Sequence, residues 1–343
     1  MKIGLIGYQG SGKSALFQWL TGVAADPALA HLSQSAMAPV PDPRVEPLCG
    51  IYHPKKITLA SLELVDTPGL VRTHEGNAQR LAVIREAGCL VMVLAAYDRA
   101  SNPLADATSL AEDMLLADME IVSGRIARLR ESTKKPRPNR DQELAELAAL
   151  EPLLQALESG TTAHAAGMSE EQLKATRSFR LLTEKPRLLL ANVADDEEQP
   201  GRLAESLTAL GAAVAVPVRL EDELARMSPE ERAQFREEMG LVGFDRDSLL
   251  RTIMDVSGQM LYFTAGEKEV RTWMLRKGGT ALEAAGNIHT DLARGFIRAE
   301  TMKCEDLIRL GSEREIKAHG LTRQEPKDYV IQDGDILNIR FSV

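Results

Sequence analysis

The sequence predicts an α/β fold: a mostly parallel sheet with helices on both faces, an inserted antiparallel helical arm and a smaller α+β unit at the C-terminal end. Three observations predict it. Short apolar runs alternate with helical stretches, as in sheets that are covered on both faces. Apolar residues at steps of three and four mark two helices in the middle of the chain. Beyond residue 263, short extended stretches are separated by glycines.

The first strand, Lys2 to Ile6, runs into Gly7 to Ser14, which fits G-x-x-x-x-G-K-S/T, the phosphate-binding loop. Ala15 to Leu20 then has helical spacing. Glycines let consecutive N–H groups converge on one anion, and the helix N-terminus adds partial positive charge. The order strand, loop, helix is the context that a phosphate-binding loop needs. Lys13 would contact the β- and γ-phosphates as a catalytic residue, and Ser14 would bind Mg²⁺. The loop residues expected to bind the nucleotide are Gln9, Gly10, Ser11, Gly12, Lys13, Ser14 and Ala15.

The stretch from Gly22 to Ala38 is small, polar and without a clear period, so we expect no regular element there. In a phosphate-loop protein this is where a hydroxyl senses Mg²⁺ and the γ-phosphate. Thr21, Ser33 and Ser35 are the hydroxyls available. An ordinary loop is an equally good interpretation for either serine.

A second nucleotide motif follows at the end of an extended segment. Ile57 to Val65 reads as extended and ends in Asp66-Thr-Pro-Gly69-Leu70, which fits D-x-x-G. Asp66 would hold Mg²⁺, directly or through water, and the Gly69 N–H would sense the γ-phosphate during catalysis. Leu70 stands where Ras-like proteins have the glutamine that orients the attacking water. Either another group orients water, or hydrolysis is slow and depends on a partner. Alternatively, the Leu70 side chain only packs within this segment.

The arm is predicted from an a/d seam over residues 115–129 that is repeated over 147–157. Between them, Ser132 to Arg140 is a basic, proline-rich turn. Two antiparallel helices with a basic tip therefore project as an arm. The tip contacts RNA phosphates or is an ordinary solvated turn.

Other elements follow from periodicity. The predicted helices are Val45 to Tyr52, Leu81 to Ala87, Leu224 to Met239 and Leu249 to Tyr262. The predicted strands are Cys89 to Ala95, Pro186 to Asn192, Ala212 to Val218, Trp273 to Leu275, Gly295 to Ala299 and Ile336 to Phe341.

A base-reading site is predicted where the strand that begins at Pro186 ends in Asn192-Val193-Ala-Asp195. Guanine-specific switch proteins carry Asn-Lys-x-Asp here, and the Asp accepts hydrogen bonds from guanine N1 and N2. Val193 replaces the lysine, and Arg219 lies where a loop would contact the base. We expect Asn192, Val193, Asp195 and Arg219 to bind the nucleotide, with a polar strand end before an acidic turn as the alternative.

Composition limits the class of protein. The chain has 343 residues, 44% of them apolar, which suffices for two or three domains. A net charge of −9 argues against a general nucleic-acid binder, and we expect no sequence-specific DNA binding. Three widely spaced cysteines read as reduced cytosolic thiols. With no signal peptide and no apolar run of membrane-spanning length, we expect a cytoplasmic protein without a membrane partner, and favour a monomer.

These motifs resemble the YchF/Obg-like ATPases, a branch of the translation-factor-related GTPase class, over nearly the whole chain. The resemblance rests on Gly7 to Ser14, Val40 to Arg44, Asp66 to Leu70, Ile84 to Glu86, Lys185-Pro186 with Asn192-Val193, Ser228 to Arg232, Tyr262 to Val270, Ala284 to Asp291, Gly295 to Glu300 and Asp328 to Asp335. It implies a G domain over residues 1–108 and 179–262, an inserted coiled-coil arm over 109–178 and a β-grasp TGS domain over 263–343. It also implies Mg²⁺-dependent nucleotide hydrolysis, a preference for ATP over GTP, and association with the ribosome or ribosomal RNA.

The chain departs from the family at several positions. Ala15 replaces the usual Thr, the loop from Tyr97 to Leu104 lacks the family histidine, and Asp195 replaces the adenine-favouring Glu. Two hypotheses follow. The first is a YchF-like NTPase that hydrolyses ATP, with GTP as the alternative. The second is a nucleotide-binding adaptor with little intrinsic hydrolysis that docks a ribosome or protein partner through the arm and the TGS domain.

Overall fold

Two units of the chain have separate cores in the computed structural model. One unit holds residues 1–36 and 63–244, and the other holds residues 37–62 and 245–343. The structure describes residues 1–342 except Ala30, Arg99, 163–166, 170, 171, 173, 175, 196, 198, 199 and 239–244. The division into a G domain, an arm and a TGS domain at the predicted boundaries stays a prediction.

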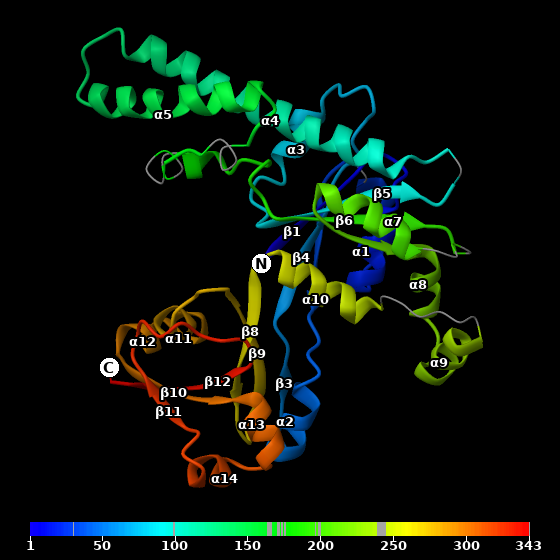
Figure 1. The fold of residues 1–343 in the computed structure, drawn as a ribbon, viewed down its shortest axis with the longest axis vertical. Helices are drawn as coiled ribbons and strands as arrows, with labels where there is room; N and C mark the ends of the chain where they lie inside the picture. Colours follow the sequence, from blue (N-terminus) through cyan, green and yellow to red (C-terminus); the bar gives the residue numbers. More distant parts are fainter. Residues whose placement is uncertain are drawn as a thin grey trace. The chain divides into compact units, whose positions relative to one another are not determined.

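The first unit is built on a six-stranded sheet in the order β2-β4-β1-β5-β6-β7 (Figure 1). The strands are β1 (Lys2–Ile6), β2 (Gln34–Pro39), β4 (Ser61–Asp66), β5 (Cys89–Ala96), β6 (Arg187–Val193) and β7 (Ala212–Val216), of which β2 and β4 cross the unit boundary. From β4 to β7 every neighbouring pair is parallel. Parallel strands at the centre of a sheet are covered on both faces, which explains why β5 and β6 are almost wholly apolar. The predicted α/β class is therefore confirmed.

Helices connect these strands. They are α1 (Lys13–Thr21), α3 (Asn77–Ala82), α4 (Pro103–Ser132), α5 (Arg140–Glu158), α7 (Pro200–Leu207), α8 (Val218–Leu224) and α9 (Pro229–Glu238), with short 3₁₀ turns at Pro27–Leu29, Arg177–Phe179 and Thr208–Leu210. Side chains of α3, α4 and α7 form one core cluster with those of the central strands. These helices therefore hold the strand ends, and the loops that follow them, in fixed positions.

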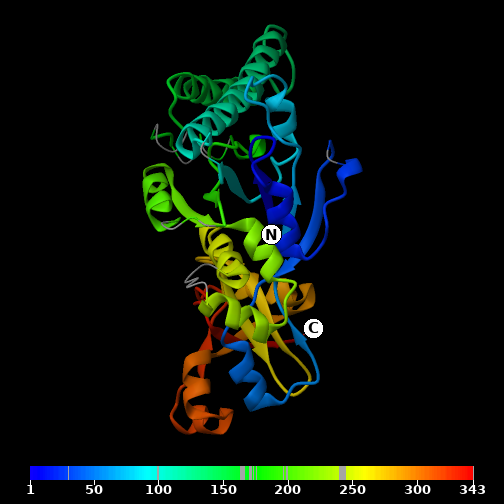
Figure 2. The ribbon, with the colours of Figure 1, turned by 90° about the vertical axis from the view of Figure 1, so that its right-hand side faces the viewer.

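The predicted antiparallel helices are present as α4 and α5, which lie side by side in both views (Figures 1 and 2). Their seam is a separate core cluster that includes Val122, Ile126, Leu150 and Leu153. Arg125 of α4 also pairs with Glu146 of α5 at 2.6 Å. The turn between them carries the basic residues of the predicted tip.

The second unit contains another six-stranded sheet, in the order β11-β10-β12-β8-β9-β3. Its strands are β3 (Ile57–Thr58), β8 (Gln259–Ala265), β9 (Val270–Arg276), β10 (Phe296–Lys303), β11 (Arg323–Glu325) and β12 (Asp335–Phe341). Its helices are α2 (Val45–Tyr52), α10 (Arg246–Val256), α11 (Ala281–Ile288), α12 (Thr290–Arg294), α13 (Cys304–Leu310) and α14 (Glu313–Ala318). Strands β8 and β9 form an antiparallel hairpin, and β12 pairs with β8 in parallel.

Some predicted elements are wrong or incomplete. Gly22 to Ala38 does contain a strand, β2, whose small residues give only a weak pattern. The helix predicted at Leu81 to Ala87 begins earlier, at Asn77, and gives way to turns after Ala82. The extended segment from Ile57 to Val65 is two strands, β3 and β4. Arg219 lies in helix α8, not in a loop.

Two predicted helices also end or begin differently. The helix predicted over Leu249 to Tyr262 stops at Val256, because Gly258 has a φ of 71° and the apolar run after it continues as β8. A short apolar run is compatible with either a helix or a buried strand. The helix predicted over Leu224 to Met239 is broken, because Ser228 caps a new helix at Pro229. Met239 lies outside the described residues.

Candidate functional site

The loop between β1 and α1 takes a shape that requires glycine. Gly10 and Gly12 have φ values of 83° and 97°, the left-handed region that side chains rarely adopt. A Cβ atom on Gly7 would lie 2.4 Å from the Val93 carbonyl oxygen, and one on Gly12 would lie 2.3 Å from Nδ2 of Asn192. Atoms of β5 and β6 therefore pack closely against the loop at Gly7 and Gly12.

Lys13 begins helix α1 and is only 6% exposed. Its Nζ donates a 3.1 Å hydrogen bond to the Tyr8 carbonyl oxygen. Burial lowers the pKa of the Lys13 ammonium, and the negative charge of Asp66 opposes that shift. The ammonium is thus held at the loop, where phosphate oxygens would replace a single backbone acceptor.

Ser14 and Asp66 come from separate elements and meet at the site. The Ser14 Oγ donates a 2.6 Å hydrogen bond to Oδ2 of Asp66, and Oδ1 of Asp66 is buried with no hydrogen-bond partner among the described residues. Burial raises the pKa of the Asp66 carboxyl, while the Ser14 hydrogen bond and the Lys13 charge lower it. A buried carboxylate oxygen without a donor beside a hydroxyl is a suitable pair of oxygen ligands for Mg²⁺. Among the described residues, no group of three or more His, Cys, Asp or Glu side chains could hold a metal ion.

The D-x-x-G segment is joined to the phosphate loop through its backbone. The Gln9 N–H donates to the Leu70 carbonyl at 3.0 Å, and the Leu70 N–H donates to the Gly7 carbonyl at 3.1 Å. A Cβ on Gly69 would lie 3.0 Å from Cα of Gln9. The Leu70 side chain is 2% exposed and belongs to the core cluster around α4. Leu70 is therefore a packing residue.

A cleft of about 850 Å³ opens over this loop. Six of the predicted site residues line it: Gln9, Gly10, Lys13, Ser14, Asp66 and Gly69. Its other walls come from the segment after Gly69, including Gln79 and Arg80, and from Ala25, Asp26, Pro27, His31, Leu32 and Gln34. No sequence motif marks Gln79 and Arg80, so neither was predicted as a site residue. Ser11, Gly12, Ala15 and the predicted base-reading residues do not line this cleft.

The three hydroxyls considered as sensors of Mg²⁺ and the γ-phosphate lie outside the cleft. Thr21 donates a 2.7 Å hydrogen bond to the Phe17 carbonyl within α1. Ser33 and Ser35 line a separate hollow of about 160 Å³ beside Glu63. The structure therefore brings none of the three to the phosphate loop.

Asn192 at the end of β6 joins two loops. Its Nδ2 donates to the Ser11 carbonyl at 3.1 Å, and its Oδ1 accepts from the Val218 N–H at 3.2 Å. Val193 is 3% exposed and belongs to the core cluster. Asp195 and Arg219 form an ion pair, with Oδ2 and Nε 3.2 Å apart. Of the four predicted residues, Asn192 contacts the phosphate loop, Asp195 and Arg219 contact each other, and Val193 is buried in the core.

Helix α4 carries three buried aspartates that contact the segment after Gly69. Asp106 pairs with Arg72, and Asp118 pairs with Arg85 at 2.6 Å. Asp113 accepts from Asn77 at 2.9 Å and lies 2.8 Å from Nδ1 of His74. The Tyr8 hydroxyl also reaches Asp113, at 3.4 Å, and burial is the main reason that the Tyr8 pKa rises to about 12. The root of the arm is therefore bonded to the loop and to the segment that senses nucleotide in this class of protein.

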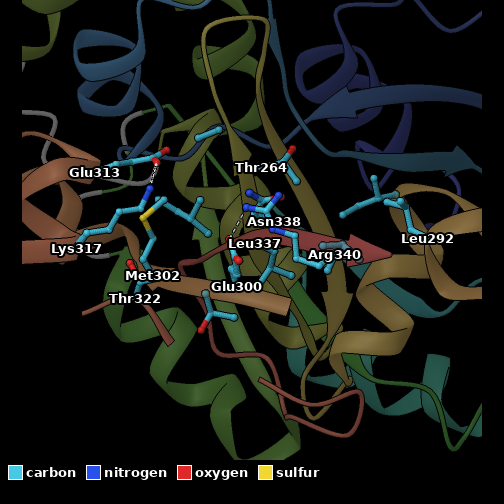
Figure 3. Close-up of a pocket in the computed structure, with 15 residues that line it drawn as sticks. Thr264, Leu292, Glu300, Met302, Glu313, Lys317, Thr322, Leu337, Asn338 and Arg340 are labelled. Atoms are coloured by element: carbon cyan, nitrogen blue, oxygen red, sulfur yellow. Dashed lines mark hydrogen bonds and ion pairs between the residues drawn. The ribbon is translucent and has the colours of Figure 1, made fainter. Parts of the chain in front are cut away.

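A further hollow, of about 390 Å³, lies in the second unit (Figure 3). Arg340 and Glu300 pair across β12 and β10 at 2.9 Å, and Lys317 pairs with Glu313 on α14 at 3.8 Å. Because each of these cations already faces a carboxylate, the four groups together carry no net charge that would attract an ion.

No described helix is long and apolar enough to cross a membrane.

Comparison with known proteins gives a consistent result. The family model MMR_HSR1, described as a 50S ribosome-binding GTPase, matches residues 2–122, and the model YchF-GTPase_C, described as a protein of unknown function, matches residues 260–342. The chain is 34% identical to the ribosome-binding ATPase YchF of Bacillus subtilis (strain 168), with 99% of each chain covered. It is also 34% identical to Obg-like ATPase 1 of Oryza sativa subsp. japonica, with 100% of this chain and 92% of the relative covered. The solved structure of the Schizosaccharomyces pombe YchF GTPase has a TM-score of 0.82 at 25% identity and covers 99% of this chain and 97% of its own.

Proposed function

The chain belongs to the YchF family, and we propose that it is a Mg²⁺-dependent P-loop NTPase that hydrolyses ATP, with GTP as the alternative substrate. The observation that carries this proposal is the convergence of Lys13, Ser14, Asp66 and Gly69 on one cleft above a glycine loop. Each of these residue types has a defined task in nucleotide hydrolysis.

The roles follow from chemistry at the loop. Backbone N–H groups of the loop other than that of Ser11, which already bonds the Tyr8 carbonyl, hold the phosphates. The Lys13 ammonium stabilises charge on the β- and γ-phosphates. Ser14 and Asp66 hold Mg²⁺, which neutralises charge on the phosphate oxygens when bound. The Gly69 N–H faces the γ-phosphate. These residues bind and polarise the nucleotide but supply no general base.

Base choice is proposed from the loop around Asn192. Both polar ends of the Asn192 amide already hold backbone groups, so its part is to fix the loops. Asp195 and Arg219 are then the side chains that face a base. We favour ATP because the relatives named above are ATPases, and because pairing with Arg219 weakens the Asp195 carboxylate as an acceptor for guanine.

Ribosome association is proposed from the relatives whose names state it and from the basic arm tip. At that tip Lys134 pairs with Glu131 at 2.5 Å, whereas Lys135 and Arg137 pair with no carboxylate among the described residues. In the second unit Arg276 pairs with Glu283 and Lys277 with Asp255, whereas Lys268 and Arg271, like the tip residues, pair with no carboxylate among the described residues. We take the tip as the first contact to test. We propose that the protein acts in the cytoplasm and is a monomer.

The adaptor alternative keeps nucleotide binding and drops efficient turnover. Leu70 favours it, because a side chain that is 2% exposed in the core cannot orient water. Turnover of purified protein without a partner separates the two functions.

The test is a competition titration of ATP against GTP with Mg²⁺, on wild-type protein and on Lys13→Ala, followed by turnover of the tighter ligand. We expect binding of ATP with measurable hydrolysis, and loss of binding in Lys13→Ala. Unchanged affinity in that variant would falsify the nucleotide site. Binding without turnover moves the proposal to the adaptor.

A further inference from the structure

Three arginines, Arg72, Arg80 and Arg85, follow the D-x-x-G segment, and they differ in whether a carboxylate pairs with them. Arg72 pairs with Asp106 and Arg85 pairs with Asp118, so both charges are neutralised by helix α4. Arg80 forms no ion pair with any described carboxylate, and it lines the cleft above the phosphate loop. Its positive charge is therefore available to a ligand in that cleft.

The Arg80 guanidinium is held in place by neutral acceptors. Nη1 donates to the Glu75 carbonyl and to Oδ1 of Asn77, both at 3.2 Å. Asn77 is only 1% exposed, because its amide also bonds both backbone groups of Val71 and the carboxylate of Asp113. A buried, fully bonded asparagine thus fixes Arg80 without cancelling its charge.

The cleft needs such a charge. In phosphoryl transfer the γ-phosphoryl oxygens carry the developing negative charge, and a second cation there raises the rate of hydrolysis strongly. Lys13, whose Nζ bonds the Tyr8 carbonyl, is the first cation at the phosphates. Leu70, at the position of the usual water-orienting residue, is packed in the core. Among the described residues that line the cleft, His31 and Arg80 are the other side chains able to carry positive charge.

We propose that Arg80 is a catalytic residue that contacts the γ-phosphoryl group in the transition state of hydrolysis. This inference rests on the proposed nucleotide hydrolysis. The oxygen of a water molecule bonds to the γ-phosphorus while the bond from that phosphorus to the β–γ bridging oxygen breaks. The diphosphate leaves with the bond's electron pair, and the water proton passes to the phosphate product. Arg80 donates to the γ oxygens and provides in this chain the positive charge that other enzymes of the class receive from a partner.

The test compares wild-type protein with Arg80→Ala, Arg80→Lys and the matched control Arg202→Ala, an exposed arginine on α7 outside the cleft. The affinity for ADP or GDP, whichever wild type binds more tightly, is measured with Mg²⁺ in the absence and presence of aluminium fluoride, which mimics the transferring phosphoryl group. kcat and KM are measured on the corresponding triphosphate.

We expect fluoride to tighten diphosphate binding in wild type and in Arg202→Ala, and to have no such effect in Arg80→Ala. We expect kcat to fall by about a thousandfold or more in Arg80→Ala, as for loss of a catalytic arginine, with KM nearly unchanged. We expect Arg80→Lys to retain part of the fluoride effect and part of the wild-type kcat. A fluoride effect that is retained in Arg80→Ala, or that is absent from wild type, overturns the inference. So does a fall in diphosphate affinity in Arg80→Ala that is large enough to explain the whole loss of activity. Wild-type protein that binds no nucleotide refutes the proposed function itself, which is a separate result.

Discussion

The Arg85 guanidinium donates a 2.6 Å hydrogen bond to the Asp118 carboxylate in the interior of the first unit. Asp118 is fully buried and also accepts hydrogen bonds from the backbone N–H groups of Leu182 and Thr183, at 3.0 and 2.9 Å. One carboxylate therefore ties the arm helix α4 both to the segment after Gly69 and to the strand connection before β6.

Asp118→Ala is predicted to lower the free energy of unfolding by about 3–5 kcal/mol, because it leaves a nearly buried guanidinium without its charge partner. The matched control is Glu151→Ala, which breaks the exposed Arg130–Glu151 pair and should cost at most about 1 kcal/mol. Urea denaturation followed by circular dichroism measures both. Equal losses in the two variants would show that Asp118 has no special structural role.

Ser14→Ala is predicted to reduce the gain in nucleotide affinity that Mg²⁺ provides. Even indirect partners of a metal ion cost about tenfold in affinity when removed, and Ser14 is expected to contact the ion directly. The measurement is nucleotide binding with Mg²⁺ and with EDTA, and Ser123→Ala on the exposed face of α4 is the control. A full Mg²⁺ effect in Ser14→Ala would remove this residue from the metal site.

Gly12→Ala is predicted to abolish nucleotide binding. The new Cβ would lie 2.3 Å from the Asn192 amide, and alanine at a φ of 97° is strained by about 1–2 kcal/mol. Gly50→Ala is the control, because nothing lies within 4 Å of its Cβ position. Binding of a fluorescent nucleotide is measured on folded protein. Normal binding by Gly12→Ala would mean that the loop tolerates a different shape.

Arg219→Ala is predicted to raise the ratio of GTP to ATP affinity. It frees the Asp195 carboxylate, which can then accept from both the N1 and N2 groups of guanine, whereas adenine offers a single amino group. An exposed pair is worth up to about 1 kcal/mol, or about fivefold. Arg226→Ala, which breaks the neighbouring pair with Asp222, is the control. A ratio that falls would indicate that Arg219 itself contacts guanine.

Lys135→Glu combined with Arg137→Glu is predicted to weaken co-sedimentation with ribosomes. Both side chains are exposed at the arm tip, and contacts to RNA phosphates depend on such charges. Arg202→Glu provides the same type of charge change far from the tip in sequence. Binding that is undiminished at physiological salt would remove the arm from the proposed contact.

Contiguous motifs made much of the fold and site predictable. The glycine loop, Lys13 and Ser14 lie in one stretch, and Asp66 follows an apolar strand, so local spacing was enough to bring them together. The a/d seam similarly predicted α4 and α5. Val45 to Tyr52 was predicted with the observed bounds because its turn segment and apolar spacing agree.

Features that depend on tertiary pairing could not be predicted in this way. Strand β2 pairs at the edge of the sheet, and its small residues carry little signal by themselves. The aspartates of α4 look like ordinary polar positions of a charged helix until Arg72, Asn77 and Arg85 are placed against them. Arg80 was missed for the same reason. Only the structure shows that Arg72 and Arg85 pair with aspartates, whereas Arg80 pairs with no described carboxylate.

The second unit combines two segments that are far apart in sequence, residues 37–62 and 245–343, and this affects its folding during translation. Leu48 of α2 is fully buried in a cluster with Phe263, Leu307 and Ile316, and β3 pairs with β9. Translation proceeds from the N-terminus at about 5–20 residues per second, so α2 is synthesised roughly 10–50 s before its partners. During that interval the nascent chain carries an apolar helix with nothing to pack against. Completion of this unit therefore waits for the last part of the message, and chains that stop early expose α2 to chaperones and proteases.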